Sequence, residues 1–366
     1  MNIIRIEQYD LCVPFLRPFQ TSYGQTTAKE ASIYVLHDES GAIGLGELDA
    51  LAHPDYIEEY LATARETVAQ YFIPRLLHHD WQHPSDIEQL FADVQGNWMA
   101  KSALETAAWD CYARSQQQPL YSLLGDVKRP IPVGISLGIE ADSSRLLARV
   151  DEAVSNGYTR VKVKIKPGYD YQPLKAIRTA YPTLTLMADA NSAYQGTNDW
   201  QVFEQLDTLQ LAMIEQPFGV RDFVGHAQLQ QALKTPICLD ESIRSVEDIQ
   251  TAAALNSCQA INLKIPRVGG LTAALAILKA ANDADMLVWL GGMYELGVGR
   301  ACNLHFSARS ELTFPGDLSA SNRYFQSDVV TPTAKLSHGN LMIPGKAGIG
   351  VSFEPKEWQT NYRVFS

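Results

Sequence analysis

The sequence predicts an α/β protein in which a (β/α)8 barrel follows an α+β domain. Three observations lead to this prediction. From about residue 130 short apolar runs alternate with helical segments, the ends of these runs recur about every 25 residues, and the first 125 residues lack this alternation. Strands that alternate with helices form parallel sheets.

Residues 1–125 combine a β hairpin with helices. The stretch ASIYVLHDESGAIGLGEL, 31–48, has an apolar run on either side of a DESG turn, which is typical of two antiparallel strands. Two later stretches, 55–77 and 102–125, carry apolar residues at helical spacing and end near Pro or Gly. The first third of the chain is therefore predicted to be α+β.

The barrel prediction depends on seven short apolar runs, each followed by polar residues and then a helical segment. The runs are IPVGISLG (131–138), RVKVKIK (160–166), TLMADAN (185–191), MIEQPF (213–218), ICLDES (237–242), INLKIPR (261–267) and LVWLGGM (287–293). Their lengths suit strands, and the segments between them suit helices.

The spacing of the strand ends favours a closed barrel. Steps of 24 to 27 residues separate the following positions: Lys164, Asp189, Glu215, Asp240, Lys264, Gly291 and Gly316. Gly316 lies in FPGD, a candidate last strand, and the run with Ser136 brings the series to eight. An open doubly wound sheet is the structural alternative, but the sequence has no Gly-rich phosphate loop after an early strand. A barrel places its active site at the carboxyl ends of its strands.

Three of these strands end in a carboxylate: Asp189, Glu215 and Asp240. Carboxylates that converge on a barrel mouth repel one another unless a cation neutralises them. Oxygen ligands with room for water and substrate favour Mg²⁺, or Mn²⁺ in its place, over Zn²⁺. Each acid alone is more simply explained as a helix N-cap, whereas three at matched spacing predict a metal site.

Lysines flank the acidic series. Lys164 ends the strand before it and Lys264 the strand after it, so the two approach the barrel centre from opposite sides. Neighbouring cations are expected to lower the pKa of such a lysine toward the range of a usable base. The alternative is that both lysines only form ion pairs with the acids. In RVKVKIK, Lys162 shares a strand face with Lys164, while Lys166 precedes a Pro-Gly turn and is expected outside the site.

The motifs KVK, DAN, IEQP, LDES, LK with RVGG, and GGMYELGVGRA resemble those of the enolase superfamily, in its muconate-lactonising branch. The resemblance covers nearly the whole chain, because PFQTSYG (18–24) is similar to a capping loop and PGDLSAS (315–321) also matches. It implies a modified (β/α)8 TIM-type barrel with an α+β capping domain. The implied parts are the cap, 1–125, the barrel, 126–321, and a segment that returns to the cap, 322–366.

The resemblance also implies roles for the strand-end residues. Asp189, Glu215 and Asp240 would hold Mg²⁺, and Lys164 and Lys264 would be the acid/base pair acting next to a substrate carboxylate. The last motifs look most like o-succinylbenzoate synthases of the type that groups with N-succinylamino-acid racemases. The same lysines serve either reaction, so both activities are expected candidates, with muconate cycloisomerase a weaker third.

Further residues are expected to contact the substrate or shield it from water. They are Lys162, Ser136, Asn191, Arg267, Gly291, Gly292, Met293, Phe19, Tyr23 and Tyr56. Eight of these ten have a simpler alternative: helix capping for the Ser and Asn, an ion pair for Arg267, a turn for the glycines, and cap core for the aromatic residues.

Composition limits the partners. A formal net charge of −11 disfavours nucleic acid and anionic membranes. The first residues lack the apolar core of a signal peptide, and no run of about 18 apolar residues occurs. These features predict a cytoplasmic location. Together with the resemblance, we expect an enzyme that acts on a small-molecule carboxylate, and we also expect a homo-oligomer.

Overall fold

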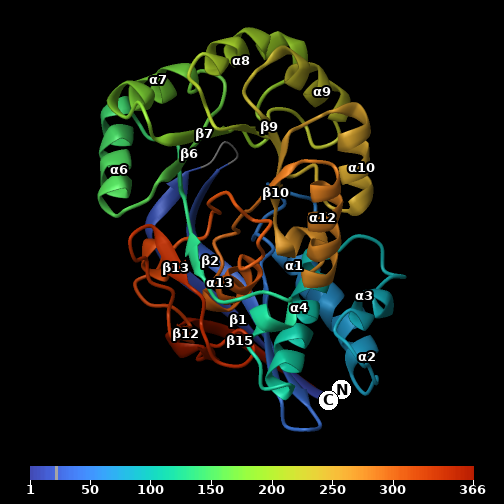
Figure 1. Ribbon diagram of the computed structural model, residues 1–366. Coiled ribbons are helices and arrows are strands. Elements are labelled where there is room, and N and C mark those ends of the chain that lie inside the picture. Colours follow the sequence, from blue (N-terminus) through green and yellow to red (C-terminus); the bar gives the residue numbers. More distant parts are fainter. Residues whose placement is uncertain (21–23) are drawn as a thin grey trace.

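The computed structural model describes residues 1–20 and 24–366, and a curled parallel sheet lies at its centre (Figure 1). Neighbouring strands of this sheet follow the chain order. The strands are β5 (Ile135–Leu137), β6 (Arg160–Lys164), β7 (Thr185–Asp189), β8 (Ile214–Glu215), β9 (Ile237–Leu239), β10 (Ala260–Leu263) and β11 (Leu287–Leu290). The predicted α/β fold, a modified barrel with an α+β cap, is confirmed.

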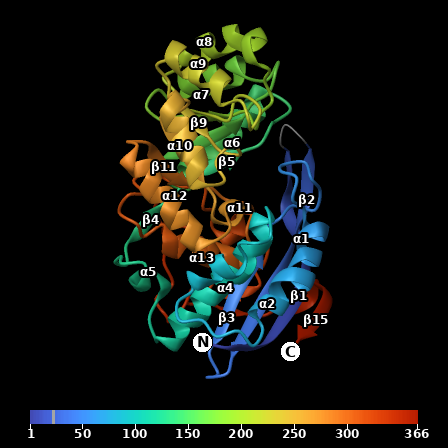
Figure 2. The same cartoon turned by 90° about the vertical axis from the view of Figure 1, so that its right-hand side faces the viewer.

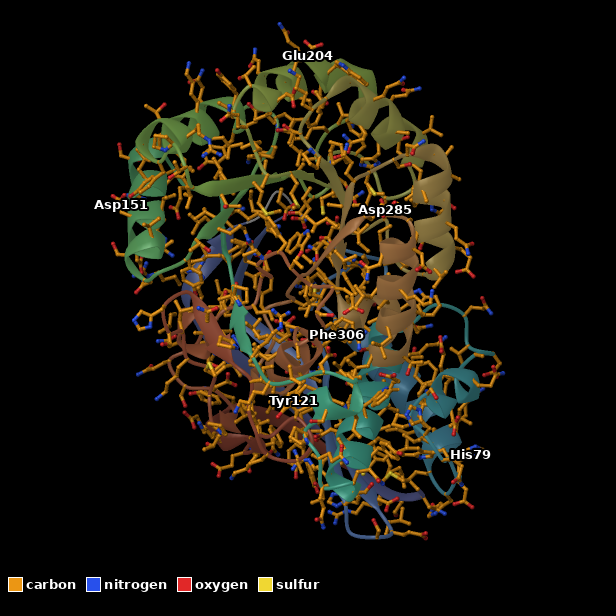
Figure 3. The ribbon with its side chains drawn as sticks, viewed as in Figure 1. His79, Tyr121, Asp151, Glu204, Asp285 and Phe306 are labelled. Atoms are coloured by element: carbon orange, nitrogen blue, oxygen red, sulfur yellow. The ribbon has the colours of Figure 1, made fainter. Side chains whose placement is uncertain are left out.

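Helices surround the outside of this sheet in an arc (Figure 1). The arc in Figure 1 consists of α6 (Ser143–Ser155), α7 (Tyr171–Ala180), α8 (Trp200–Asp207) with the preceding turn η2 (Gly196–Asp199), α9 (Phe223–Ala232), α10 (Val246–Leu255) and α12 (Leu271–Asp283). Two further helices, α11 (Ile265–Val268) and α13 (Gly297–Phe306), are buried in the interior. Figure 3 shows Asp151 of α6 and Glu204 of α8 on the outer rim, whereas Phe306 lies in the interior. The apolar faces of these helices cover the sheet.

The predicted eighth strand is not a regular strand. Gly316 forms only an isolated parallel bridge to Val133, and Asp317 N donates to Leu290 O at 2.9 Å. The segment therefore spans the gap between β11 and the start of β5 with single contacts on each side. Pro315 has no N–H to donate, which limits a regular ladder at this position.

A second sheet belongs to the cap, by which we mean this sheet and helices α1 to α5. Its order is β15-β1-β2-β3, all antiparallel, and the long strands β1 and β2 run along one side of the molecule (Figure 2). The strands are β1 (Ile3–Gln20), β2 (Gln25–Asp38), β3 (Ile43–Leu48) and β15 (Gln359–Phe365). The helices are α1 (Leu61–Thr67), the π-helical turn η1 (Val68–Phe72), α2 (Ile73–Leu76), α3 (Asp86–Leu90), α4 (Trp98–Ser115) and α5 (Leu120–Leu123).

Helix α4 lies between the cap sheet and the barrel and is buried over most of its length. Two glycines of β3 allow it to approach the sheet. A Cβ atom on Gly46 would lie 1.9 Å from Ala103 O, and one on Gly44 would lie 2.0 Å from Ala107 O. Because these two positions have no side chains, α4 can pack directly against β3 within the cap.

The last part of the chain adds a strand to the cap sheet and pairs with a strand that precedes the barrel sheet. Strand β15 pairs with β1, which brings the two termini together, and β13 (Asn340–Met342) pairs with β4 (Pro130–Pro132) ahead of the barrel (Figure 1). The remaining short elements are η3 (Ser321–Arg323), β12 (Val330–Thr331), β14 (Ser352–Phe353) and η4 (Lys356–Trp358). The division of the chain at 125/126 and 321/322 stays a prediction.

In the part of the chain that the structure describes, no helix combines the length and the apolar character needed to cross a membrane. Of the residues predicted to shield the site, Tyr23 lies outside the described residues.

Candidate active site

Strand β6 directs its lysines into the barrel and its valines outward. Val161 and Val163 belong to the apolar core, whereas Lys162 and Lys164 face the carboxyl ends of neighbouring strands. The period of two in RVKVK produces this separation. Lys166, beyond the end of β6, is exposed, as its place before the turn predicted.

Lys162 lies among three carboxylates. Its Nζ is 2.7 Å from Asp317 Oδ2, 2.8 Å from Glu215 Oε2 and 2.9 Å from Asp189 Oδ2. The ammonium group also lies over the Trp289 ring, 5.0 Å from its centroid. Lys162 therefore stands as a cation at the point where strands β7 and β8 end.

Lys164 donates to Asp189 Oδ2 and to Asn191 Oδ1, both at 2.6 Å. Asn191 Nδ2 in turn donates to Glu241 Oε1 at 2.9 Å. Burial opposes the charged form of Lys164, but Asp189 outweighs it, so the pKa of the ammonium lies above its usual value even though Lys162 lowers it. The expected lowering is thus absent here, because the partners are carboxylates rather than added cations.

Lys264 lies on the other side of the acidic series, directly after β10. Its Nζ donates to Asp240 Oδ2 and to the hydroxyl of Tyr56, both at 2.8 Å. Asp240 opposes the effect of burial and raises the pKa of Lys264. Tyr56 comes from the cap, so the hydroxyl joins the cap to the end of β10.

Arg267 lies behind Lys264 and is fully buried. Its Nη1 pairs with Asp240 Oδ1 and donates to Tyr56 Oη, and its Nη2 donates to Asn262 O. These contacts match the ion-pair alternative for Arg267. The guanidinium does not line the cavity described below.

The three predicted metal ligands are buried at the ends of β7, β8 and β9. Asp189 faces Glu215 in the register of β7 and β8. Burial and repulsion from Asp189 raise the pKa of Glu215 to about 8. Burial opposes ionisation of Asp240, but Lys264 and Arg267 outweigh it and hold the pKa of Asp240 below its usual range.

Among the described residues, no three Asp, Glu, His or Cys side chains surround one point as ready-made metal ligands. The residues nevertheless fit a hard cation. Lys162 Nζ already contacts oxygens of two of the acids, and two more buried oxygens nearby, Glu241 Oε2 and Asn262 Oδ1, have no hydrogen-bond partner within the described part of the chain. Oxygen donors of this kind suit Mg²⁺.

A cavity of about 40 Å³ lies above these groups. Most of the residues predicted to contact substrate line it: Phe19, Tyr56, Ser136, Lys162, Asn191, Gly292 and Met293, together with both candidate catalytic lysines. Gly291 does not line it; a Cβ atom there would lie 2.0 Å from Asn262 Oδ1. Because ligand sites usually measure roughly 300 Å³ or more, lining side chains must rearrange to admit a substrate.

Sequence reasoning missed several cavity residues. Asp317 pairs with Arg160 at 2.6 Å and with Lys162, and it accepts a hydrogen bond from Ser136 Oγ at 2.9 Å. Asp317 follows Gly316 at the end of the predicted last strand, so the spacing of the strand ends could have identified it as a site residue. Further lining residues that were not predicted are Leu51, Tyr294, Glu295, Arg300, Ser319 and Tyr324.

A buried ion pair of the cap holds the loop that follows β11. Lys29 Nζ lies 3.0 Å from Asp49 Oδ1 and donates to Met293 O at 3.0 Å. Glu47 accepts from Leu296 N and Gly299 N at 2.7 and 2.8 Å. We call Lys29, Asp49 and Glu47 the cap clamp, because they fix the loop that carries Met293 into the cavity.

Two protein-family models match this chain, one over its N-terminal part and one over most of the remainder. Residues 5–125 match the mandelate racemase / muconate lactonizing enzyme N-terminal domain, and residues 145–357 match the enolase C-terminal domain-like family. The chain therefore belongs to the enolase superfamily, a family of enzymes.

Two named relatives and one solved structure are similar to this chain over nearly its whole length. The chain is 50% identical over 366 residues to an o-succinylbenzoate synthase of Enterococcus faecalis, covering 100% of this chain and 98% of the relative. It is 41% identical over 351 residues to an N-succinylamino acid racemase of Thermus thermophilus, covering 95% of each. A solved enolase-superfamily member from Listeria innocua superposes with a TM-score of 0.97 at 44% identity, covering 100% of this chain and 99% of that one.

Proposed function

We propose that this chain is an o-succinylbenzoate synthase. It removes water from 2-succinyl-6-hydroxy-2,4-cyclohexadiene-1-carboxylate to give o-succinylbenzoate, a menaquinone precursor. The observation that carries the proposal is the placement of a buried lysine on either side of the acidic series, with both lysines lining one cavity. The relative from Enterococcus faecalis supports the choice of reaction.

We further propose that the enzyme depends on Mg²⁺, held by Asp189, Glu215 and Asp240. When bound, the ion supplies positive charge that stabilises the negative charge developing on the substrate carboxylate. Mn²⁺, another hard cation that prefers oxygen ligands, is expected to substitute for it.

The formal charges of the site support a dicarboxylate substrate. The cations around the cavity are Arg160, Lys162, Lys164, Lys264 and Arg267, and the acids are Asp189, Glu215, Asp240, Glu241 and the partly buried Asp317. The five cations and five acids carry equal and opposite formal charges. A bound divalent cation would therefore give the site a formal charge of +2. The ring carboxylate and the succinyl carboxylate of the proposed substrate supply two negative charges in return.

Lys164 is the proposed base. Pairing with Asp189 favours the ammonium form of Lys164, and this pairing would weaken in favour of the neutral amine when Asp189 holds a divalent cation. In its neutral form the amine accepts the proton from the carbon next to the ring carboxylate, and the conjugate acid then donates that proton to the departing hydroxide, so that one water leaves. Asn191 positions this amine, because its Oδ1 accepts from Lys164 Nζ and its Nδ2 is held by Glu241.

Lys264, as an ammonium group on the opposite side, stabilises the enediolate anion that forms. The Tyr56 hydroxyl orients it at 2.8 Å. A second activity, racemisation of N-succinylamino acids, is favoured by the same pair of lysines, since each can exchange a proton on one face of the substrate. The relative from Thermus thermophilus supports this second candidate.

The test uses the purified full-length chain with the cyclohexadiene substrate and Mg²⁺. Formation of the aromatic product, followed by absorbance, is expected to stop on addition of EDTA and to resume with excess Mg²⁺. No aromatic product with either Mg²⁺ or Mn²⁺ would reject the synthase proposal. Incubation with N-succinylamino acids in D2O tests the second activity, which is rejected when no α-deuterium appears.

A further inference from the structure

A second pocket, which we call the arginine pocket, lies outside the active site between β1, α6 and the segment after η3. Its volume is about 530 Å³. The charged residues that line it are Arg17, Arg149, Glu152, Arg323 and Lys335. It shares no lining residue with the active-site cavity.

The arginine pocket carries positive charge on a protein whose formal net charge is −11. Four of its lining side chains are cationic, and Glu152 is the one acid among the lining residues that the structure describes. Glu140 lies 3.9 Å from Arg149 Nε. Counting both acids, the formal charge of the pocket is +2, which a doubly charged anion would balance.

The guanidinium of Arg149 lies close enough to those of Arg17 and Arg323 to be repelled by both. Arg17 Nη1 lies 3.4 Å from Glu152 Oε2, and Arg149 Nη1 pairs with the same oxygen. Burial, together with repulsion from Arg323 and Arg17, lowers the pKa of Arg149 despite the attraction of Glu152. One carboxylate oxygen thus serves two arginines, which leaves their charge only partly compensated.

Arg323 lines the arginine pocket and contacts Ser136, which lines the active-site cavity. Its Nη2 donates to Ser136 O at 2.8 Å, while its buried Nε has no hydrogen-bond partner among the described residues. Arginine offers five donors in a planar fork that suits carboxylate and phosphate oxygens. Because Arg323 Nε is itself buried, the donors that an oxyanion could reach are other N–H groups of the guanidinium side chains that line the pocket, Arg17 among them at 67% exposure.

We propose that the arginine pocket binds a small dianion, either phosphate or a dicarboxylate, at Arg149, Arg17 and Arg323. The two sources share the chemistry of paired oxygens with two negative charges. The neutral lining, which includes Asn156 and Tyr158, adds polar groups at the edge of the same pocket. This proposal is independent of the reaction proposed for the active site.

The test measures binding of inorganic phosphate and of succinate by calorimetry and by thermal shift, each compared with sodium chloride at equal ionic strength. The variant Arg149→Gln removes a lining guanidinium. Arg145→Gln is the matched control, because Arg145 lies on the same helix with its side chain 71% exposed and does not line the pocket. Since a charged hydrogen bond contributes roughly 1.5 to 3 kcal/mol, Arg149→Gln is expected to weaken binding about tenfold or more, and Arg145→Gln to leave it unchanged.

Preference for phosphate identifies a phosphoryl ligand, preference for succinate identifies a dicarboxylate, and equal responses identify a site for either. The proposal is overturned when neither probe binds better than chloride, or when Arg149→Gln binds as wild type does. Equal losses in Arg149→Gln and Arg145→Gln also overturn it. Arg17→Gln, at a side chain that is 67% exposed, provides the same comparison when Arg149→Gln does not fold.

Discussion

The cap clamp makes a quantitative prediction about stability. Lys29 and Asp49 are 3% and 2% exposed, and the carboxylates of Glu47 and Glu295 also act on the Lys29 ammonium. Substituting Lys29→Met removes the cation from this group of buried acids. The same change removes the donor to Met293 O, whose residue lines the active-site cavity.

The expected cost follows from burial. Removing one partner of a buried ion pair typically costs about 3 to 5 kcal/mol, because an unpaired charge stays in the interior. The loss of the hydrogen bond to Met293 O adds about 1 kcal/mol. We therefore expect Lys29→Met to lower the free energy of unfolding by about 4 to 6 kcal/mol, and to raise KM because the Met293 loop loses its anchor.

Urea unfolding and steady-state kinetics measure these two effects. The matched control is Lys279→Met, which breaks the exposed pair between Lys279 and Asp283 and is expected to change little. Adding Asp49→Asn to Lys29→Met removes the unpaired charge and is expected to restore part of the lost stability. Equal stability losses in Lys29→Met and Lys279→Met would refute the reasoning about burial.

Two more predictions concern stability. Burial lowers the pKa of His226 to about 4, and its Nε2 accepts from Phe218 N, so the folded state holds a neutral ring. The unfolded chain binds this proton near pH 6.5, and the free energy of unfolding should fall by about 3 kcal/mol as the pH drops from about 6.5 to 4. Urea unfolding at several pH values in this range should show a weaker dependence of the free energy of unfolding on pH for His226→Gln than for wild type. The exposed His53→Gln should keep the wild-type dependence. Equal pH dependence in His226→Gln and wild type would contradict the neutral state of His226. Gly46→Ala should lower the free energy of unfolding by about 3 kcal/mol, measured by urea unfolding, because its Cβ atom would collide with the backbone of α4. Gly219→Ala is the control, because the space around Gly219 is open. Equal stability of the two variants would disprove the close approach of α4 to β3.

The fold was largely predictable because periodicity is a local signal. Period two in RVKVK separates inward lysines from outward valines, and regular steps between strand ends place Asp189 and Glu215 opposite each other. The last strand was not predictable in detail. Gly316 lies at the expected position, but its single bridge to Val133 depends on how the two ends of the sheet meet.

The site was predictable where its residues end strands and less so where distant segments meet. Tyr56 reaches Lys264, and Lys29 reaches Met293, from parts of the chain more than 200 residues away, and no local pattern encodes such contacts. Arg267 is fully buried and pairs with Asp240, and its predicted contact with substrate stays a prediction. The roles of the metal ligands and of the two lysines stay predictions.

The most direct test of the account is the rate of dehydration in lysine variants, measured with saturating Mg²⁺. Lys164→Ala and Lys264→Ala should each lower kcat by about 10²- to 10⁴-fold, since each removes a group that moves or stabilises charge in the reaction. Lys166→Ala, at an exposed position just after the same strand, should keep the wild-type rate. A Lys164→Ala variant that retains more than about a tenth of the wild-type kcat would contradict the assignment of Lys164 as the base.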